Sequence, residues 1–257
     1  MNQHWEDKES NKILCGGMIK NALDLKTELI IFPELTLTGF SMDTKNISEY
    51  FDNAPTIGYF KKQAFENEMG IVFGMCLNET IGYTNCAMYV SKSGEIETIY
   101  RKIHPFSFAD EDKYFTPGTD ISIFKLKDLS IGLSICYDLR FPELYRLYAN
   151  DCQLQINIAN WPAKRIDHWS TLLKARAIEN QYVVIGVNRT GRDGNSVDYI
   201  ESSKAFLPDG SLVLPEYYSN DLAVVEIDNR IVSEYRSTFP VLRDRRIEID
   251  NKGKKHD

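Results

Sequence analysis

The chain has 257 residues, of which 43% are hydrophobic and 26% are charged, an ordinary composition for a globular protein. Its net charge of −7 and the lack of a basic stripe argue against nucleic acid as a partner. No apolar stretch approaches the roughly 18 residues that a membrane helix needs. No linker or internal repeat interrupts the chain, so we expect one domain over residues 1–257.

The cysteines favour a reducing, cytoplasmic compartment. Their number is odd and no C-x-x-C pair occurs, so the sequence indicates neither a disulfide framework nor a zinc site. The polar segment 1–12 has no signal-peptide core. The five cysteines are Cys15, Cys76, Cys86, Cys136 and Cys152.

Apolar runs and helical patterns share the chain, which predicts an α/β fold whose sheet faces are both covered. The charged tail after Arg243 is expected to be extended. In chain order we expect a helix over Ser10–Leu25, a strand over Leu29–Phe32, a helix over Thr56–Glu68, strands over Gly70–Leu77, Asn85–Val90, Ile96–Tyr100 and Leu129–Cys136, a helix over Pro142–Ala149, a strand over Leu154–Ala159, a helix over Asp167–Asn180, strands over Tyr182–Val187 and Leu222–Ile227, and a helix over Asn229–Tyr235.

Cys136 stands apart from the other cysteines because it ends a buried strand and precedes a predicted helix that carries Pro142 in its first turn. A thiol on such a turn faces backbone N–H groups and a helix N-terminus, a field that favours the thiolate. The commoner role of a free cysteine is that of a small buried apolar residue. Position therefore makes Cys136 a candidate nucleophile without proving it.

Glu34 and Lys102 also follow predicted strands, and functional groups of α/β sheets gather at the carboxyl ends of strands. A buried carboxylate can serve as the base for a thiol. A cation and the backbone N–H of Tyr137 could stabilise an oxyanion on the attacked carbonyl. The ordinary alternatives are a loop start at Glu34 and a solvated Arg101-Lys102 pair.

At these residues the chain resembles the nitrilase superfamily, the carbon–nitrogen hydrolases that use a Glu–Lys–Cys triad. The resemblance covers nearly the whole chain and rests on three ordered motifs, IFPEL around Glu34, YRKIHPF around Lys102 and CYDLRFPEL from Cys136. It implies a four-layer αββα sandwich in each subunit and a homodimer. It also implies that no metal or organic cofactor is required. The family's second glutamate corresponds to the segment 108–118, where Glu111 is the candidate.

Three later segments, 159–169, 173–181 and 188–195, are similar to the omega-amidase branch of that superfamily. Enzymes of this branch hydrolyse the terminal amide of 2-oxoglutaramate or 2-oxosuccinamate to the 2-oxo diacid and ammonia. The resemblance thus implies a small-molecule amide substrate and a thioester on Cys136. A related amidase specificity, for deaminated glutathione or an N-carbamoyl or N-acyl compound, and a non-catalytic dimeric scaffold are the alternatives.

A diacid monoamide needs a cation for its distal carboxylate, and Arg140 and Arg165 are the candidates. For Arg140 we favour a different role, bracing the turn through Asp138 or Glu143. The aromatic residues that could line the pocket are Trp161 and Phe40.

A rival catalytic scheme pairs Cys136 with His104 or His168, although no cysteine-protease signature surrounds either histidine. One feature departs from the family pattern. Family chains open with a strand that ends near a glutamine, whereas only Met1-Asn-Gln3-His precedes the corresponding segment here. We therefore expect the first strand to be missing or very short, which would expose a sheet edge.

Overall fold

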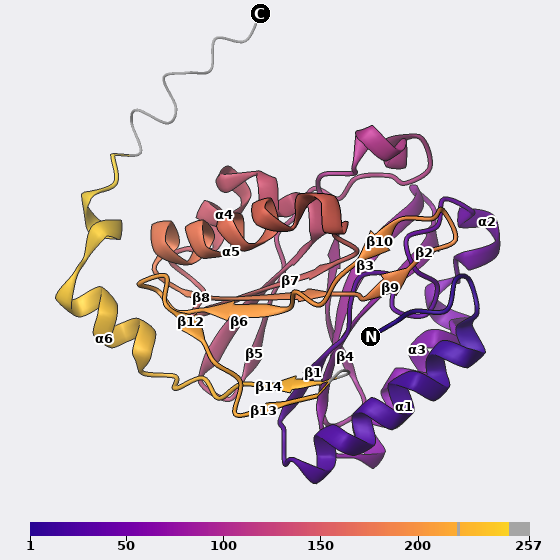
Figure 1. Ribbon diagram of the computed structural model, residues 1–257, viewed down its shortest axis with the longest axis horizontal. Helices are drawn as coiled ribbons and strands as arrows, with labels where there is room; N and C mark the ends of the chain where they lie inside the picture. The colour runs from indigo at the N-terminus through magenta and orange to yellow at the C-terminus, as the bar shows by residue number, and fades with distance from the viewer. Residues whose placement is uncertain (220–221, 247–257) are drawn as a thin grey trace, which may run out of the picture.

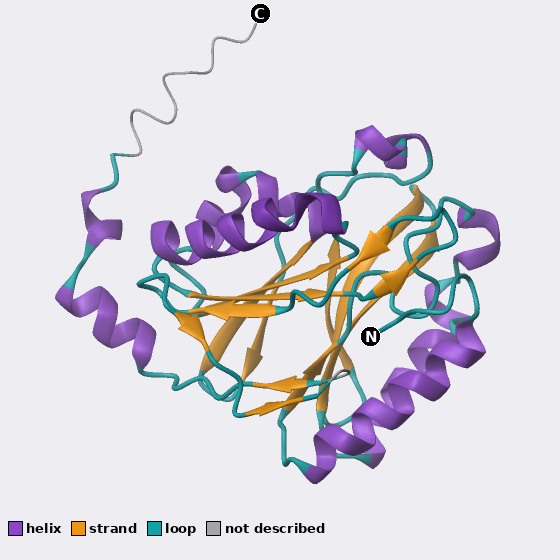
Figure 2. Cartoon of the chain, in the orientation of Figure 1, coloured by secondary structure: helices purple, strands orange, loops and turns teal. Residues whose placement is uncertain are grey.

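The computed structural model describes residues 1–219 and 222–246 and has four layers, two sheets packed face to face with helices outside each (Figures 1 and 2). Helices α1 and α3 cover the four-stranded sheet, and α4 and α5 cover the six-stranded sheet (Figure 1). The predicted αββα sandwich is confirmed. The first sheet has the order β1-β2-β3-β4, with β1 Leu29–Ile31, β2 Gly70–Glu79, β3 Gly82–Val90 and β4 Ile96–Arg101.

The second sheet contains three neighbouring parallel strands, β6, β7 and β8, whose carboxyl ends meet at one edge. Antiparallel strands β5 and β11 flank them. Residues that follow β6 and β7 therefore lie close together although more than 20 positions separate them in the chain. The sheet has the order β12-β11-β8-β7-β6-β5, with β5 Ile123–Leu126, β6 Leu129–Ile135, β7 Leu154–Ala159, β8 Val183–Asn188, β11 Lys204–Phe206 and β12 Leu212–Val213.

Helices α1, α3 and α4 begin where the sequence supplies a starting signal. Asp7 caps α1 by accepting from the backbone N–H of Ser10, and α3 and α4 each carry proline in their first turn. Across the described ranges, no helix is both long enough and apolar enough to cross a membrane. The α-helices are α1 Lys8–Asp24, α2 Thr44–Ile47, α3 Pro55–Glu66, α4 Pro142–Tyr148, α5 Ile166–Asn180 and α6 Ile231–Thr238.

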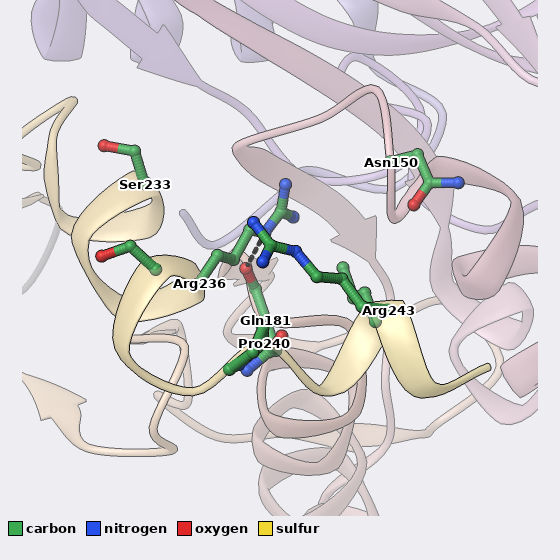
Figure 3. Close-up of a pocket in the computed structure, with 8 residues that line it drawn as sticks. Asn150, Gln181, Ser233, Arg236, Pro240 and Arg243 are labelled. Atoms are coloured by element: carbon green, nitrogen blue, oxygen red, sulfur yellow. Dashed lines mark hydrogen bonds between the residues drawn. The ribbon is translucent and has the colours of Figure 1, made fainter.

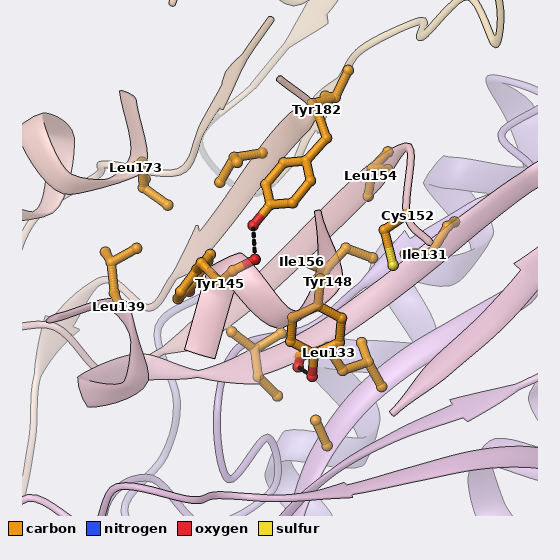
Figure 4. Packing of buried hydrophobic residues seen from close by; sticks show 14 of the residues in the cluster. Ile131, Leu133, Leu139, Tyr145, Tyr148, Cys152, Leu154, Ile156, Leu173 and Tyr182 are labelled. Atoms are coloured by element: carbon orange, nitrogen blue, oxygen red, sulfur yellow. Dashed lines mark hydrogen bonds between the residues drawn. The ribbon is translucent and has the colours of Figure 1, made fainter. Parts of the chain in front are cut away.

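Tyrosines fill much of the core between α4, α5 and the second sheet (Figure 4). The hydroxyl of Tyr148 donates to the carbonyl of Leu133 at 2.6 Å, and the hydroxyl of Tyr182 donates to the carbonyl of Tyr145 at 3.1 Å. Each ring thus buries its apolar face while its polar end finds a partner, as a buried hydroxyl requires.

Most predicted elements are present, and the differences have local causes. The predicted strand Leu222–Ile227 is reduced to β14 Ala223–Val224, which pairs only with β13 Tyr217–Tyr218 and joins neither large sheet. Strands β5 and β11 escaped prediction because each has only three or four residues, one of which is a lysine. The helix predicted over Pro142–Ala149 is α4 Pro142–Tyr148, and the residues directly before it form a 3₁₀ helix, η4 Cys136–Arg140, that the sequence did not predict.

The first residues of the chain form a single bridge and a set of side-chain contacts rather than an extended strand. Asn2 makes an isolated parallel bridge to Thr190, beside the small hairpin of β9 Gly191–Arg192 and β10 Asp198–Tyr199. Gln3 follows at once, and its buried side-chain amide faces the carbonyls of Glu34, Leu35 and Thr36 at 3.0–3.1 Å. A single glutamine side chain therefore supports the turn that carries Glu34.

Arg236 on α6 attaches the C-terminal segment to the rest of the fold. Its guanidinium donates to the carbonyls of Gln181 and Asn180 at the end of α5 (Figure 3). It also reaches the carbonyls of Ala149 and Cys152 after α4, so one cation satisfies the ends of two helices. A cavity of about 290 Å³ lies beside it. The expected charged tail lies outside the described residues from position 247 onward.

Candidate active site

Cys136 occupies a sharp turn at the carboxyl end of β6. Its backbone has a φ of +44°, the left-handed region that is strained for a residue with a side chain. The next residues form η4, whose first N–H groups, including that of Tyr137, have no partner within the helix. The Cys136 side chain is buried, with 9% of the residue exposed. The fold therefore holds this thiol in one orientation at the sheet edge.

The pKa of Cys136 lies well above its ordinary value, first because of burial and then because of the Glu34 carboxylate. Lys102 and the backbone N–H of Asn160 act in the opposite direction without reversing the shift. The expected stabilisation of a thiolate by the helix N-terminus is therefore wrong for this structure. The group at rest is a thiol, and it needs a base.

Three buried charged residues form a compact cluster beside that thiol. The ammonium of Lys102 lies 2.8 Å from Glu34 Oε1 and 3.0 and 2.9 Å from Glu111 Oε1 and Oε2. The side-chain amide of Asn85 donates to Glu34 at 2.9 Å and to Glu111 at 3.0 Å. Lys102 is 2% exposed and both carboxylates are fully buried, so the lysine is the cation that compensates two buried acids.

The cluster sets the charge states of its members. Burial alone would lower the pKa of Lys102, but Glu111 and Glu34 raise it above the ordinary lysine value. Burial raises the pKa of Glu111, Lys102 opposes that rise, and Glu34 adds to it. Lys102 therefore stays an ammonium at every pH of interest, while Glu111 holds a proton more readily than a surface glutamate.

Glu34 links the two sheets. Its Oε2 accepts from the backbone N–H of Asn160, the residue after β7, at 2.8 Å. The Asn160 side chain in turn donates to the backbone carbonyl of Glu34 at 2.7 Å. Glu34 follows β1 of the first sheet and Cys136 follows β6 of the second, so these two bonds join Glu34 to the sheet that carries Cys136.

The four predicted catalytic residues thus come together as the sequence motifs indicate. Glu34, Lys102 and Glu111 belong to the side of the first sheet, and Cys136 to that of the second. The chain neighbours of the two glutamates also have left-handed backbone, with φ values of +45° at Leu35 and +60° at Asp110. Such strain persists only where surrounding contacts impose it and is concentrated at functional sites.

Asp138 braces the turn and was missed as a site residue. Its buried Oδ1 accepts from the backbone N–H of His104 at 3.0 Å and lies 2.8 Å from His104 Nδ1. Its Oδ2 accepts from the Tyr100 hydroxyl at 2.7 Å and the Ile135 N–H at 3.0 Å. Tyr100 and His104 flank Lys102 in the chain, so one carboxylate ties the lysine segment to the cysteine turn.

The predicted brace role of Arg140 is wrong, because it forms no ion pair with Asp138 or Glu143 among the described residues. Arg176 of α5 braces the turn instead, because its guanidinium donates to the carbonyl of Leu139 in η4 at 2.8 and 3.1 Å. Its Nη1 pairs with Glu179 at 2.9 Å.

The histidines do not reach the thiol. His104 is bound to Asp138 and stacks on Phe141 with ring centroids 3.7 Å apart. His168 faces Arg140 at 3.3–3.4 Å. The rival cysteine–histidine arrangement is therefore absent among residues 1–219 and 222–246.

The aromatic candidates lie around the site. Phe40 is half-buried, and the Lys102 ammonium lies 5.2 Å from its ring centre. Trp161 is buried, and its indole N–H donates to the carbonyl of Arg165 at 2.8 Å.

The sequence analysis missed Asn85 and Asn160, which bind the Glu34 carboxylate. The signal that could have identified them is a polar residue within or directly after an apolar strand.

A buried thiol, two carboxylates and a lysine at the meeting edge of two sheets define a hydrolase of the four-layer αββα class. The family model described as carbon-nitrogen hydrolase matches residues 1–237. The chain belongs to the carbon–nitrogen hydrolase family and is a hydrolase that acts on the carbon–nitrogen bonds of amides.

Its relatives include amidases. It is 35% identical to the 2-oxoglutaramate amidase of Paenarthrobacter nicotinovorans, over 87% of this chain and 80% of the relative. It is 33% identical to the omega-amidase YafV of Escherichia coli K12, over 84% of each. A superfamily protein from Xanthomonas campestris, solved with an arsenic adduct in its active site, superposes with a TM-score of 0.88 at 30% identity, over 95% of this chain and 94% of the other.

Proposed function

We propose that this protein is an omega-amidase that hydrolyses the terminal amide of 2-oxoglutaramate or 2-oxosuccinamate through a cysteine thioester. The observation that carries the proposal is the buried cluster of Glu34, Lys102 and Glu111 beside the protonated thiol of Cys136. The amidase names of relatives at 33–35% identity support the choice of substrate.

In the first half-reaction, Glu34 takes the thiol proton as the Cys136 sulfur attacks the amide carbon. The Lys102 ammonium and the Tyr137 backbone N–H stabilise the negative oxygen. The carbon–nitrogen bond then breaks, Glu34 delivers the proton to the leaving nitrogen, and ammonia departs. The acyl group remains on sulfur as a thioester.

In the second half-reaction, Glu34 removes a proton from water while the oxygen attacks the thioester carbon. Glu111 orients this water and keeps the Lys102 ammonium in position from the side opposite Glu34. The carbon–sulfur bond breaks, the thiolate regains the proton, and the 2-oxo dicarboxylic acid is released. The raised pKa of Cys136 suits a sulfur that is protonated between turnovers.

The test is ammonia release from a panel of 2-oxoglutaramate, 2-oxosuccinamate, glutamine, deaminated glutathione and a simple nitrile. We expect turnover of the first two compounds and its loss in Cys136→Ala. Cys15→Ala is the matched control, since Cys15 is equally buried but lies in α1. Activity confined to deaminated glutathione would show that the protein is a related amidase of different specificity. Full activity in Cys136→Ala would refute the mechanism.

We propose that the protein forms a homodimer in a reducing, cytoplasmic compartment. Exposed apolar side chains lie on α5 at Ile178 and on and after β12 at Leu212 and Leu214, which supports an interface. All five cysteines are free and buried, as in proteins of reducing compartments. Light scattering of the purified chain tests the oligomeric state, and a monomer mass would refute it.

A further inference from the structure

Two arginines at the rim of the site have no acidic partner. Among the described residues, neither Arg140 nor Arg165 forms an ion pair. The Arg165 guanidinium makes no hydrogen bond there, and the one hydrogen-bond partner of the Arg140 guanidinium in these ranges is His168, at 3.3–3.4 Å. Both residues are half-buried, so water compensates their charges only in part.

Within residues 1–219 and 222–244, the other half-buried or buried arginines are compensated. Arg101 pairs with Glu79, and Arg176 pairs with Glu179. Arg236 and Arg189 donate to several backbone carbonyls. Two neighbouring guanidiniums without either kind of compensation are therefore unusual within this fold and indicate a site prepared for an anion.

The two guanidiniums share one aromatic wall, formed by Phe106, Tyr137 and Trp161. Arg140 lies 4.7 Å from the Trp161 ring centre and 5.9 Å from that of Tyr137. Arg165 lies 5.4 Å from the ring centre of Phe106, which itself lies 4.8 Å from Tyr137. A guanidinium held near the face of a ring by the cation–π attraction keeps N–H groups available for an anion.

The electrostatics agree with this geometry. The pKa of Arg140 is lowered, first by burial and then by the nearby positive charge of Arg165. Arg165 also occupies the N-cap of α5, where its side chain makes no capping bond and the helix end adds positive potential. An anion between the arginines would relieve this repulsion.

We propose that Arg140 and Arg165 together bind the carboxylate at the end of the substrate remote from the scissile amide, so that the enzyme selects monoamides of dicarboxylic acids. This inference rests on the proposed function and deepens it. The wall begins at Tyr137, the residue after the nucleophile, and Arg140 ends the same turn. The charge of Arg140 also interacts with Cys136, which places this arginine near the thiol that would hold the amide.

The test compares glutaramate, which carries the distal carboxylate, with its methyl ester, which has the same chain without the charge. Arg140→Gln and Arg165→Gln should each lower kcat/KM for the acid about 10- to 100-fold, mainly through KM, because a charged hydrogen-bonded pair is lost. The ester should lose less than about threefold. The matched control is Arg230→Gln, an exposed arginine paired with Asp228 in the C-terminal segment.

Arginine-to-lysine variants separate charge from geometry. Arg165→Lys keeps the positive charge but not the planar fork, so its loss on glutaramate should lie between those of wild type and Arg165→Gln. Equal losses on acid and ester, or no loss on the acid, would overturn the proposal. Circular dichroism of each variant confirms that the comparison concerns folded protein.

A binding measurement keeps this proposal separate from the catalytic one. Glutarate is titrated calorimetrically into the Cys136→Ala chain, which cannot turn over. Adding Arg140→Gln or Arg165→Gln to that background should weaken binding about 10- to 100-fold. If wild type releases no ammonia from any amide while this binding persists, the proposed function fails and the carboxylate site stands. Equal glutarate affinity with and without the arginines refutes the site.

Discussion

Replacing Lys102 with methionine tests the electrostatic description of the site most directly. The ammonium is the cation between Glu34 and Glu111, at 2.8 and 2.9 Å, and all three side chains are buried. Methionine keeps most of the side-chain volume and leaves two carboxylates joined only through the Asn85 amide. The substitution therefore isolates charge from packing.

Breaking a buried ion pair by removing one partner costs about 3–5 kcal/mol, and Lys102→Met breaks two that share the same cation. Without the ammonium, burial raises the pKa of Glu111 further above the ordinary glutamate value of about 4.3, and proton uptake by this carboxyl reduces the cost. A pKa raised on folding adds stability that is present below the unfolded-state pKa and is lost as pH rises through the folded-state pKa. The loss in Lys102→Met should thus be larger at pH 8 than at pH 5.

Urea unfolding of the variants measures these free energies. Lys102→Met should lose about 3–5 kcal/mol at pH 8, and adding Glu111→Gln should recover part of that loss because only one buried carboxylate remains. The control is Lys61→Met, whose exposed pair with Glu95 should cost less than about 1 kcal/mol. A Lys102→Met protein as stable as wild type at pH 8, or one that Glu111→Gln destabilises further, would refute the reasoning.

Three further outcomes follow from individual contacts. Gly74→Ala should lower the free energy of unfolding, measured in urea, by about 1–3 kcal/mol, because a Cβ at this position would lie 2.6 Å from the backbone nitrogen of Leu35. Unchanged stability would contradict this steric argument. Asp138→Asn should cost about 1.5–3 kcal/mol of stability and slow ammonia release, because an amide cannot accept from all four donors that surround the carboxylate. A variant that is as active and as stable as wild type would contradict the role of Asp138 in holding the Cys136 turn. Burial raises the pKa of Cys86 to about 12, above the value in the unfolded chain. Between these two pKa values only the unfolded chain loses the thiol proton, so the stability of the folded state falls as pH rises. Between pH 9 and 11 the unfolding free energy of wild type should therefore fall more steeply than that of Cys86→Ala, by about 1.4 kcal/mol per pH unit.

The sequence by itself determined the class of fold and the candidate catalytic residues. Apolar strands with helical segments between them fit only a layered α/β arrangement, and the three motifs placed Glu34, Lys102 and Cys136 at strand ends. Because parallel strands of one sheet end at the same edge, residues that follow those strands meet in space. Short strands such as β5, with four residues, lacked a comparable local signal.

Only the tertiary structure decided the charge state of the nucleophile and the partners of the polar residues. Local sequence suggested a thiolate at Cys136, but burial and Glu34 from the opposite sheet raise its pKa. Local sequence also suggested a brace role for Arg140, whereas Asp138 is satisfied by donors from the lysine segment. Desolvation and ion pairing depend on distances between segments remote in sequence, and no pattern within one segment contains those distances.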